Sequence, residues 1–155
     1  MYNDYGLDVT IKTGGLQVPS GTQLLMGDAV DFFMSYGMDA VNAVTQNIPK
    51  VTVAAIFQKD PRCLIAHPNP AIKILANLKG KPIYVSASAK ITYWPLLGAK
   101  YGFTDDQKCP YNFNLAPFLI GKNSAQQGYI ASDPFAIEKQ GGFQPVVFLL
   151  ADYGY

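Results

Sequence analysis

The feature that most constrains the fold of this chain is the alternation of short β-type segments with short helix-type segments. Apolar, β-rich runs such as 51–57, 83–85 and 146–150 each neighbour a helix-type segment, and glycine or proline stands at many of the junctions. Such alternation is typical of βα units, because parallel strands need a crossover that is usually a helix. The sequence therefore predicts an α/β fold with mostly parallel sheets.

The individual elements follow from periodicity and from turn residues. Predicted strands cover 7–11, 30–34, 51–57, 63–66, 83–85, 112–115, 128–131 and 146–150. Predicted helices cover 23–27, 38–46, 71–78, 86–101, 116–123 and 133–139. Pro95 lies inside one of these helices, which must begin late or kink there, because proline is tolerated only in the first turn. The Pro-rich stretch 61–70 is the best candidate for a boundary between two lobes.

Charge and composition exclude several classes of partner. The net charge is +1, from 12 basic and 11 acidic residues, so no basic surface is expected to bind nucleic acid. The apolar run 145–151 is too short to span a bilayer, and no polybasic stretch indicates a membrane surface. The chain is rich in tyrosine, with 10 residues, and tyrosine can stack on a ligand and hydrogen-bond it. A small molecule is therefore the expected partner.

No motif for catalysis, a metal or a cofactor is present in the sequence. It contains no Gly-x-Ser-x-Gly, no His-Glu-x-x-His and no P-loop, so no catalytic residue and no cofactor is predicted. A zinc site is not expected from two separated cysteines, Cys63 and Cys109, and a single histidine. A disulfide is possible, but two reduced, buried thiols are favoured. His67, before a proline, is interpreted as a surface or hinge residue.

Five segments together resemble a known family. They are Tyr5–Ile11 with Gly14 and Gly15, Leu25–Phe32, Leu78–Val85, Gly128–Ala136 and Phe148–Tyr155. Read in this order, they resemble type 2 periplasmic solute-binding proteins of the nitrate/sulfonate/taurine and thiamine-pyrimidine-precursor branch. Asp133 is a departure, since many relatives have Ser-Glu-Pro at that place.

The resemblance implies a two-lobed architecture in which lobe 1 is incomplete. Residues 1–66 would form a partial lobe 1, 67–80 an interlobe segment, 81–145 lobe 2, and 146–155 the return toward lobe 1. The N-terminus has no signal-peptide core, and the family's first strand, first helix and C-terminal portion find no match, so we expect an internal fragment. The family implies a periplasmic or membrane-anchored extracellular location and an ABC transporter permease as partner.

In two-lobed α/β binding proteins the ligand lies in the cleft at the carboxyl ends of the strands, where helix N-termini and turn amides point. On lobe 1 this predicts ligand-binding residues Gly14, Gly15, Tyr36, Gly37 and Met38. On lobe 2 it predicts Ser86, Ala87, Ser88, Tyr93, Trp94, Tyr129, Ser132 and Asp133. Each could instead be purely structural, as a turn glycine, helix cap, core aromatic or helix-dipole carboxylate. Since adjacent helical residues point about 100° apart, Tyr93 and Trp94 cannot both face the cleft squarely.

The function expected from these residues is the binding of a small solute for an ABC importer. Aromatic rings with Asp133 as an acceptor suggest a thiamine pyrimidine precursor or a similar nitrogen heterocycle. A sulfonate, nitrate or taurine ligand remains an alternative, although it would need basic groups, and only Lys90 lies near the predicted lobe 2 site. A second alternative is an enzyme like the pyrimidine-precursor synthases of the same fold, although their cysteine cluster is missing here. A third is a regulatory ligand-sensing domain.

The incomplete lobe 1 also predicts self-association. Without the family's first strand, segments Leu7–Ile11 and Val30–Met34 would have unpaired edges. Because an unpaired apolar edge strand can pair with another chain, we expect a homo-oligomer formed through lobe 1.

Overall fold

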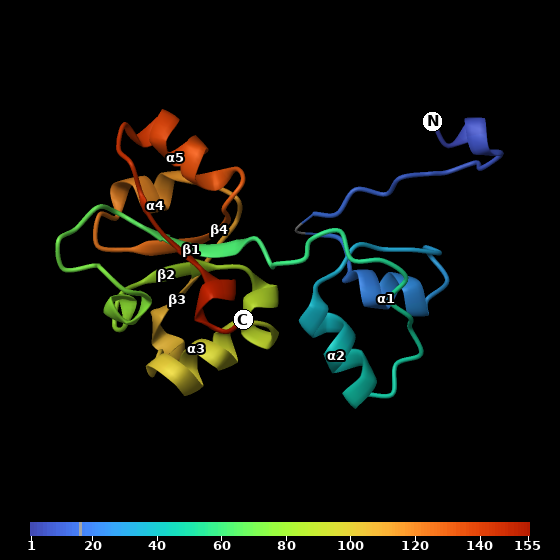
Figure 1. Cartoon of the computed structure of the whole chain (residues 1–155), viewed down its shortest axis with the longest axis horizontal. Coiled ribbons are helices and arrows are strands. Elements are labelled where there is room, and N and C mark those ends of the chain that lie inside the picture. The colour runs from blue at the N-terminus through green and yellow to red at the C-terminus, as the bar shows by residue number, and fades with distance from the viewer. Residues whose placement is uncertain (16) are drawn as a thin grey trace.

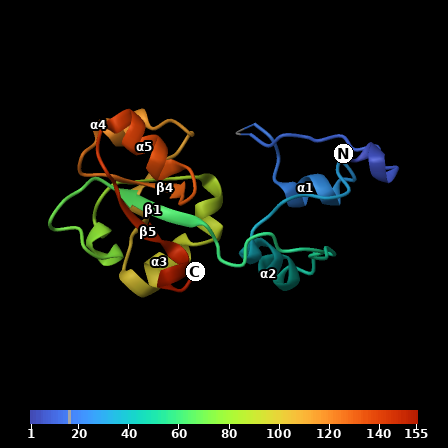
Figure 2. The same cartoon turned by 45° about the horizontal axis from the view of Figure 1, so that its top comes forward.

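The computed structural model describes residues 1–15 and 17–155, which form two parts of different character (Figure 1). The N-terminal part contains helices α1 (Gly21–Met26) and α2 (Gly37–Thr45), a 3-10 turn at Asn3–Tyr5 and long connecting segments. From residue 62 onward the chain forms a sheet covered by helices. Figures 1 and 2 both show the N-terminal part beside this sheet, joined to it at the start of the first strand.

A single five-stranded sheet forms the centre of the second part. Its strands are β1 (Arg62–Ala66), β2 (Ile83–Val85), β3 (Lys108–Pro110), β4 (Ala125–Tyr129) and β5 (Val146–Leu149), in the order β3-β2-β4-β1-β5. β2 runs parallel to β3 and β4, whereas β1 is antiparallel to β4 and β5. All strands except β1 therefore point the same way, and the predicted α/β class with a mostly parallel sheet is confirmed.

Helices cover both faces of the sheet, with α3 (Trp94–Tyr101) on one face and α4 (Ala116–Ile120) and α5 (Asp133–Gly141) on the other (Figure 1). Side chains alternate between the faces of a strand. Leu64 of β1 accordingly packs in the α3 cluster, whereas Cys63 packs with Phe118 in the α4 and α5 cluster. Pro95 lies in the first turn of α3, so the helix begins late, one of the two predicted outcomes.

The predicted elements from residue 62 onward largely form. The strands predicted at 63–66, 83–85, 128–131 and 146–150 correspond to β1, β2, β4 and β5, and the helices at 116–123 and 133–139 to α4 and α5. The segment 86–101 divides into a 3-10 helix, Ala87–Ile91, and α3, while 71–78 keeps only a 3-10 turn at Leu75–Leu78. The strand predicted at 112–115 is wrong, because Phe113 has a φ of 62°, in the left-handed region that strands exclude.

The N-terminal part differs most from the prediction. Helices α1 and α2 form where helices were expected, but 7–11, 30–34 and 51–57 are not strands. These segments pair with no neighbouring strand among the described residues, and a strand needs such pairing to satisfy its backbone groups. The segment 51–57, predicted to be buried, is exposed throughout, with Val51 at 86%. Ala43 is the only buried hydrophobic residue before β1 in the described chain.

The division into two lobes stays a prediction. In the structure, β1 and β5 lie in the same sheet as β2, β3 and β4, although the predicted boundaries assign 62–66 and 146–149 outside lobe 2. Among the described residues, no helix combines the length and apolar character that crossing a bilayer would require.

His67 is a core residue, so its interpretation as a surface or hinge residue is wrong. Its ring is 7% exposed and lies 4.4 Å from the ring of Phe118 and 4.6 Å from that of Phe143, centroid to centroid. Its Nε2 lies 2.7 Å from the backbone oxygen of Phe118. The aromatic sandwich and this hydrogen bond together allow a polar ring to be buried.

Both cysteines are free thiols, as favoured by the sequence, and Cys63 is buried while Cys109 is half-buried. Burial, with a smaller contribution from the charge of Asp133, raises the pKa of the Cys63 thiol to about 12. Cys63 is therefore a neutral core side chain near pH 7.

Candidate functional site

A cavity of about 200 Å³ lies at the edge of the sheet that faces the N-terminal part. It is lined by Tyr36, Arg62, Ser86, Ser88, Tyr111, Phe113, Gln127, Gly128, Tyr129 and Asp133. β2, β3 and β4 are parallel, so their carboxyl ends meet at one edge. Ser86 and Tyr111 directly follow β2 and β3, and Tyr129 is the last residue of β4. The cavity therefore occupies the carboxyl ends of parallel strands, where ligands bind in open α/β sheets.

Arg62 comes to the same edge because β1 runs antiparallel to β4, which places its first residue opposite Tyr129. The guanidinium carbon lies 3.4 Å from the ring centroid of Tyr36, and Nη1 donates to Thr92 Oγ1 at 3.0 Å and to Tyr155 Oη at 3.2 Å. Burial lowers the pKa of Arg62, but the phenol oxygens of Tyr36 and Tyr155 raise it by more. The net pKa lies above the ordinary value, so a full positive charge stands in the cavity wall.

Tyr36 and Tyr129 connect the two parts of the molecule at this cavity. Their hydroxyl oxygens lie 2.5 Å apart. Burial and the hydrogen bond with Tyr36 raise the pKa of Tyr129 to about 12, so the Tyr129 hydroxyl is neutral near pH 7. Because Tyr36 precedes α2, a ligand in the cavity would contact the N-terminal part and the sheet at once.

A polar network of side chains forms the floor of the cavity. Gln127 Oε1 accepts from the backbone N–H of Ser86 at 2.7 Å and from Tyr93 Oη at 2.9 Å, so the amide is oriented by the protein. The hydroxyls of Ser86 and Ser88 lie 3.0 Å apart. Ser86 makes no side-chain cap hydrogen bond to the helix that follows it, so its hydroxyl is not used in capping.

Asp133 begins α5 and supplies the negative charge of the cavity. Its Oδ2 accepts from the backbone N–H of Tyr129 at 2.8 Å and from Ser132 Oγ at 3.2 Å. Oδ1 has no hydrogen-bond partner among the residues that the structure describes. One carboxylate oxygen thus fixes the turn after β4, and the other is left as an acceptor.

Two aromatic rings, Tyr111 and Phe113, lie at the mouth of the cavity. Their centroids are 5.2 Å apart and their planes are inclined by 55°. Phe113 is 68% exposed, and a flat ligand could cover it. Aromatic faces of this kind stack well on planar rings.

The structure brings five of the predicted site residues together, namely Tyr36, Ser86, Ser88, Tyr129 and Asp133. Gly14 and Gly15 lie in an exposed connecting segment away from the cavity lining. Gly37 and Met38 begin α2 next to Tyr36 but do not line the cavity, and Ala87 and Ser132 are exposed beside lining residues.

Tyr93 and Trp94 are both buried in the core, at 1% and 3% exposure. Tyr93 supports the site indirectly through Gln127, whereas Trp94 Nε1 donates to Asp105 Oδ1 at 3.2 Å. Neither side chain lines the cavity.

Five lining residues were missed from the sequence: Arg62, Tyr111, Phe113, Gln127 and Gly128. A signal for Arg62 was available, because it is the only arginine in the chain and directly precedes an apolar strand. No comparable signal marks Tyr111 and Phe113, since the strand before them, β3, was itself not predicted.

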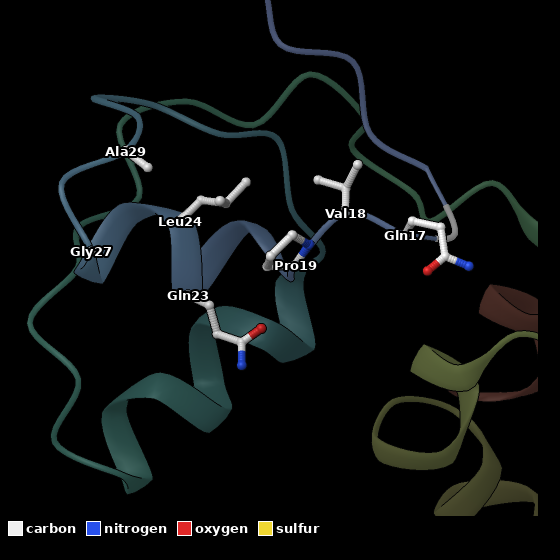
Figure 3. A pocket seen from close by; sticks show the side chains of 7 residues that line it. All are labelled: Gln17, Val18, Pro19, Gln23, Leu24, Gly27 and Ala29. Atoms are coloured by element: carbon white, nitrogen blue, oxygen red, sulfur yellow. The ribbon is translucent and has the colours of Figure 1, made fainter.

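A larger hollow of about 650 Å³ surrounds α1 (Figure 3). It is lined by Gln17, Val18, Pro19, Gln23, Leu24, Gly27 and Ala29. All come from α1 and the segments directly flanking it, as Figure 3 shows, and none is charged. A wide, open hollow with no charged group and one short local segment as its wall offers little to orient a ligand, so the sheet-edge cavity is the candidate site.

Comparison with known proteins gives one match. The sequence matches the family described as NMT1/THI5 like over residues 1–155. No curated protein and no solved structure matches the chain significantly. The family consists mainly of substrate-binding components of ABC importers, which bind a small molecule, work with a permease and are typically periplasmic or extracellular.

The match confirms the resemblance drawn from the five sequence segments, and the mixed α/β sheet is consistent with a partial periplasmic-binding-protein-like fold. The chain belongs to the NMT1/THI5-like family of solute-binding proteins.

Proposed function

We propose that this protein binds a small, flat nitrogen heterocycle, such as a thiamine pyrimidine precursor, in the cavity at the carboxyl ends of β2, β3 and β4. The observation that carries the proposal is the pairing of aromatic walls with the unused carboxylate oxygen of Asp133. An amino group on a heteroaromatic ring is a donor that such an oxygen would accept, while the ring stacks on an aromatic face.

The other polar groups of the cavity fit the same ligand class. Gln127 Nε2 has no partner among the described residues and is held in place through its oxygen, so it can donate to a ring nitrogen. The hydroxyls of Ser86 and Ser88 can donate or accept. A few fixed polar groups between apolar walls are what orient a small ligand in a binding site.

The role we propose is capture and delivery, not turnover. Cys63 carries a neutral thiol and His67 is enclosed by two phenylalanine rings, and neither lines the cavity. Family membership supports delivery to an ABC permease and a periplasmic or extracellular location. Tyr36 contacts Tyr129 across the two parts, so closure of these parts on a ligand is a suitable signal for a permease.

A thermal-shift panel tests the ligand class. A saturating aminopyrimidine, such as 4-amino-5-hydroxymethyl-2-methylpyrimidine, should stabilise the fold by roughly 2–4 kcal/mol and raise the melting temperature more than taurine or nitrate does. Asp133→Asn should weaken aminopyrimidine binding about tenfold or more, because the amide can still accept from Tyr129 N–H but no longer offers a second acceptor.

The matched control is Asp106→Asn, which removes the same charge from an exposed residue outside the cavity. It should bind like the wild type. Equal or larger shifts with taurine or nitrate, or no effect of Asp133→Asn on aminopyrimidine binding, would reject the proposed ligand class.

A further inference from the structure

Gly128 lies in β4 where the strand reaches the candidate cavity, and it lines that cavity. It is buried and pairs with Cys63 of β1. It is not among the glycines with positive φ, so its backbone conformation is open to any residue. A glycine inside a strand weakens the strand and often marks a close approach of another part of the protein. The reason for this glycine therefore lies in the space beside it.

The space beside Gly128 is filled by Asp133 and Ile65. A Cβ added to Gly128 would lie 2.9 Å from Asp133 Cβ, 3.0 Å from Asp133 Cγ and 2.7 Å from Ile65 Cδ1. Non-bonded carbon atoms prefer a separation of about 3.5–4.0 Å. Any side chain at this position must therefore displace Asp133, Ile65 or both.

The two neighbours differ in how easily they can move. The crowded atom of Ile65 is the outer end of a flexible side chain, which a change of rotamer can withdraw. The crowded atoms of Asp133 lie next to the backbone at the first residue of α5, and Pro134, with its fixed φ, restricts that backbone. Asp133 Oδ2 also accepts from the backbone N–H of Tyr129 at 2.8 Å. Displacing Asp133 would shift the start of α5 or break this hydrogen bond.

We propose that Gly128 is a positioning residue for ligand recognition. Its lack of a side chain lets α5 approach β4 closely enough for Asp133 to hold the Tyr129 N–H with Oδ2 while Oδ1 stays free as an acceptor. Gly128 thus acts through Asp133 and sets how well the site distinguishes a ligand that donates to this carboxylate from one of the same shape that does not, because such discrimination needs a fixed acceptor. The inference rests on the proposed function, in which Asp133 accepts from a ring amine.

The test compares Gly128→Ala with Gly141→Ala, a matched control near the end of the same helix. A Cβ added to Gly141 would be equally crowded, at 2.7 Å from Phe143 Cε1 and 2.8 Å from Leu119 Cδ2, but Gly141 does not line the cavity. A general effect of crowding α5 should therefore appear in both variants, and an effect on Asp133 only in Gly128→Ala. A third variant, Gly128→Ala with Ile65→Val, removes Ile65 Cδ1 and leaves the contact with Asp133.

The ligand readout uses 4-amino-5-hydroxymethyl-2-methylpyrimidine and an analogue with a methyl group in place of the amine. Titration calorimetry with the full chain measures both dissociation constants. The wild type should prefer the amine by about tenfold or more, as expected for a hydrogen bond to a charged group. Gly128→Ala should reduce this preference to about threefold or less and leave the methyl analogue nearly unaffected.

The other variants show whether the effect passes through Asp133. Gly141→Ala should keep the preference for the amine, and Ile65→Val should not restore it to Gly128→Ala. In an Asp133→Asn background, Gly128→Ala should change the preference little, because two residues that act through one contact are not additive. A full further loss of preference in that background would show that Gly128 acts by another route.

A second readout needs no ligand. Hydrogen exchange of the Tyr129 amide, corrected for its changed neighbour, reports on the bond to Asp133. Its protection should fall by about tenfold in Gly128→Ala, toward the level of Asp133→Ala, and should be kept in Gly141→Ala. Unchanged protection in Gly128→Ala would show that Asp133 has not moved and would overturn the positioning role.

The outcomes separate this inference from the proposed function. If the wild type binds neither pyrimidine, the proposed function fails, and exchange of the Tyr129 amide decides the positioning role alone. If the wild type prefers the amine and Gly128→Ala keeps that preference, the positioning role is wrong while the proposed function stands. Circular dichroism checks folding first. If Gly128→Ala does not fold, adding Asp133→Gly, which removes the crowded Asp133 atoms, should restore folding, and failure to do so would overturn the inference.

Discussion

Gln126 lies within β4, and its side chain has no hydrogen-bond partner in the described part of the chain, which leads to a prediction about stability. The residue is 0% exposed, and neither Nε2 nor Oε1 has a hydrogen-bond partner among the residues that the structure describes. A buried polar group left unsatisfied costs about 1–3 kcal/mol. Replacing Gln126 with methionine, which has nearly the same shape, removes that cost, so we expect the free energy of unfolding to rise by about 1–3 kcal/mol.

Gln107 provides a matched control, because it is buried to a similar degree but both its Nε2 and its Oε1 are hydrogen-bonded. It is 3% exposed, its Nε2 donates to Leu78 O and Lys81 O, both at 2.9 Å, and its Oε1 accepts from Thr104 N at 3.1 Å. Gln107→Met breaks three hydrogen bonds, two of which satisfy backbone carbonyls. Its free energy of unfolding should fall by roughly 2–4 kcal/mol, at about 1 kcal/mol for each bond.

Urea denaturation followed by circular dichroism measures both variants. With an m-value of about 2 kcal/mol/M, each kcal/mol moves the midpoint by about 0.5 M. The two midpoints should move in opposite directions with unchanged m-values. A clear loss of stability in Gln126→Met would show that the Gln126 side chain is satisfied in solution, for example by a buried water, and that the reasoning from its isolation is wrong.

Three further predictions follow from other residues. The carboxylate of Asp39 accepts hydrogen bonds from Ser35 and Thr22 and forms an ion pair with Lys50 at 2.9 Å. Burial raises the pKa of Asp39, but these three partners lower it by more, so the net pKa lies below 3.8. Its contribution to stability is therefore complete above about pH 4–5 and is lost as the pH falls through the depressed pKa; hydrogen exchange should show α1 and α2 opening in acid, and Asp39→Asn should remove that dependence near α2. Half-buried Cys109 should react with a thiol reagent in the folded protein while Cys63 stays unmodified, because it is buried and its pKa is about 12; faster labelling of Cys63, judged by peptide mapping, would contradict this. The self-association predicted from the sequence is tested by sedimentation. The side chains of Phe32 (77%) and Val53 (75%) are exposed and could be covered in an interface. The double variant Phe32→Ser with Val53→Ser should shift the protein toward monomer, whereas a wild-type monomer at micromolar concentration would reject the prediction.

The sequence predicted best those elements that pack on the sheet. The burial of β1 and β2 could be read from their apolar residues, and Pro95 located the late start of α3, because these features depend on local physical chemistry. For the segments 7–11, 30–34 and 51–57, local sequence alone could not show whether strands form. Their β-type patterns describe what the segments would do beside a pairing neighbour, and no such neighbour is present among the described residues.

The residues of the candidate site were also predicted only where the local sequence pattern was sufficient. Ser86 and Asp133 follow strands that were recognised and Tyr129 lies at the end of one, so the rule about carboxyl ends located them. Arg62 was missed because it stands at the amino end of β1, and only the antiparallel pairing of β1 with β4 brings that end to the cavity. Strand direction is a tertiary property that the local pattern does not contain.

The measurement that tests the central claim most directly is a crystal structure of the protein with a bound 4-aminopyrimidine. Our account predicts the ring in the cavity between the aromatic walls, with its amine within about 3 Å of the free oxygen of Asp133. A ligand found in the hollow around α1, or at any place that leaves Asp133 without contacts, would contradict the account.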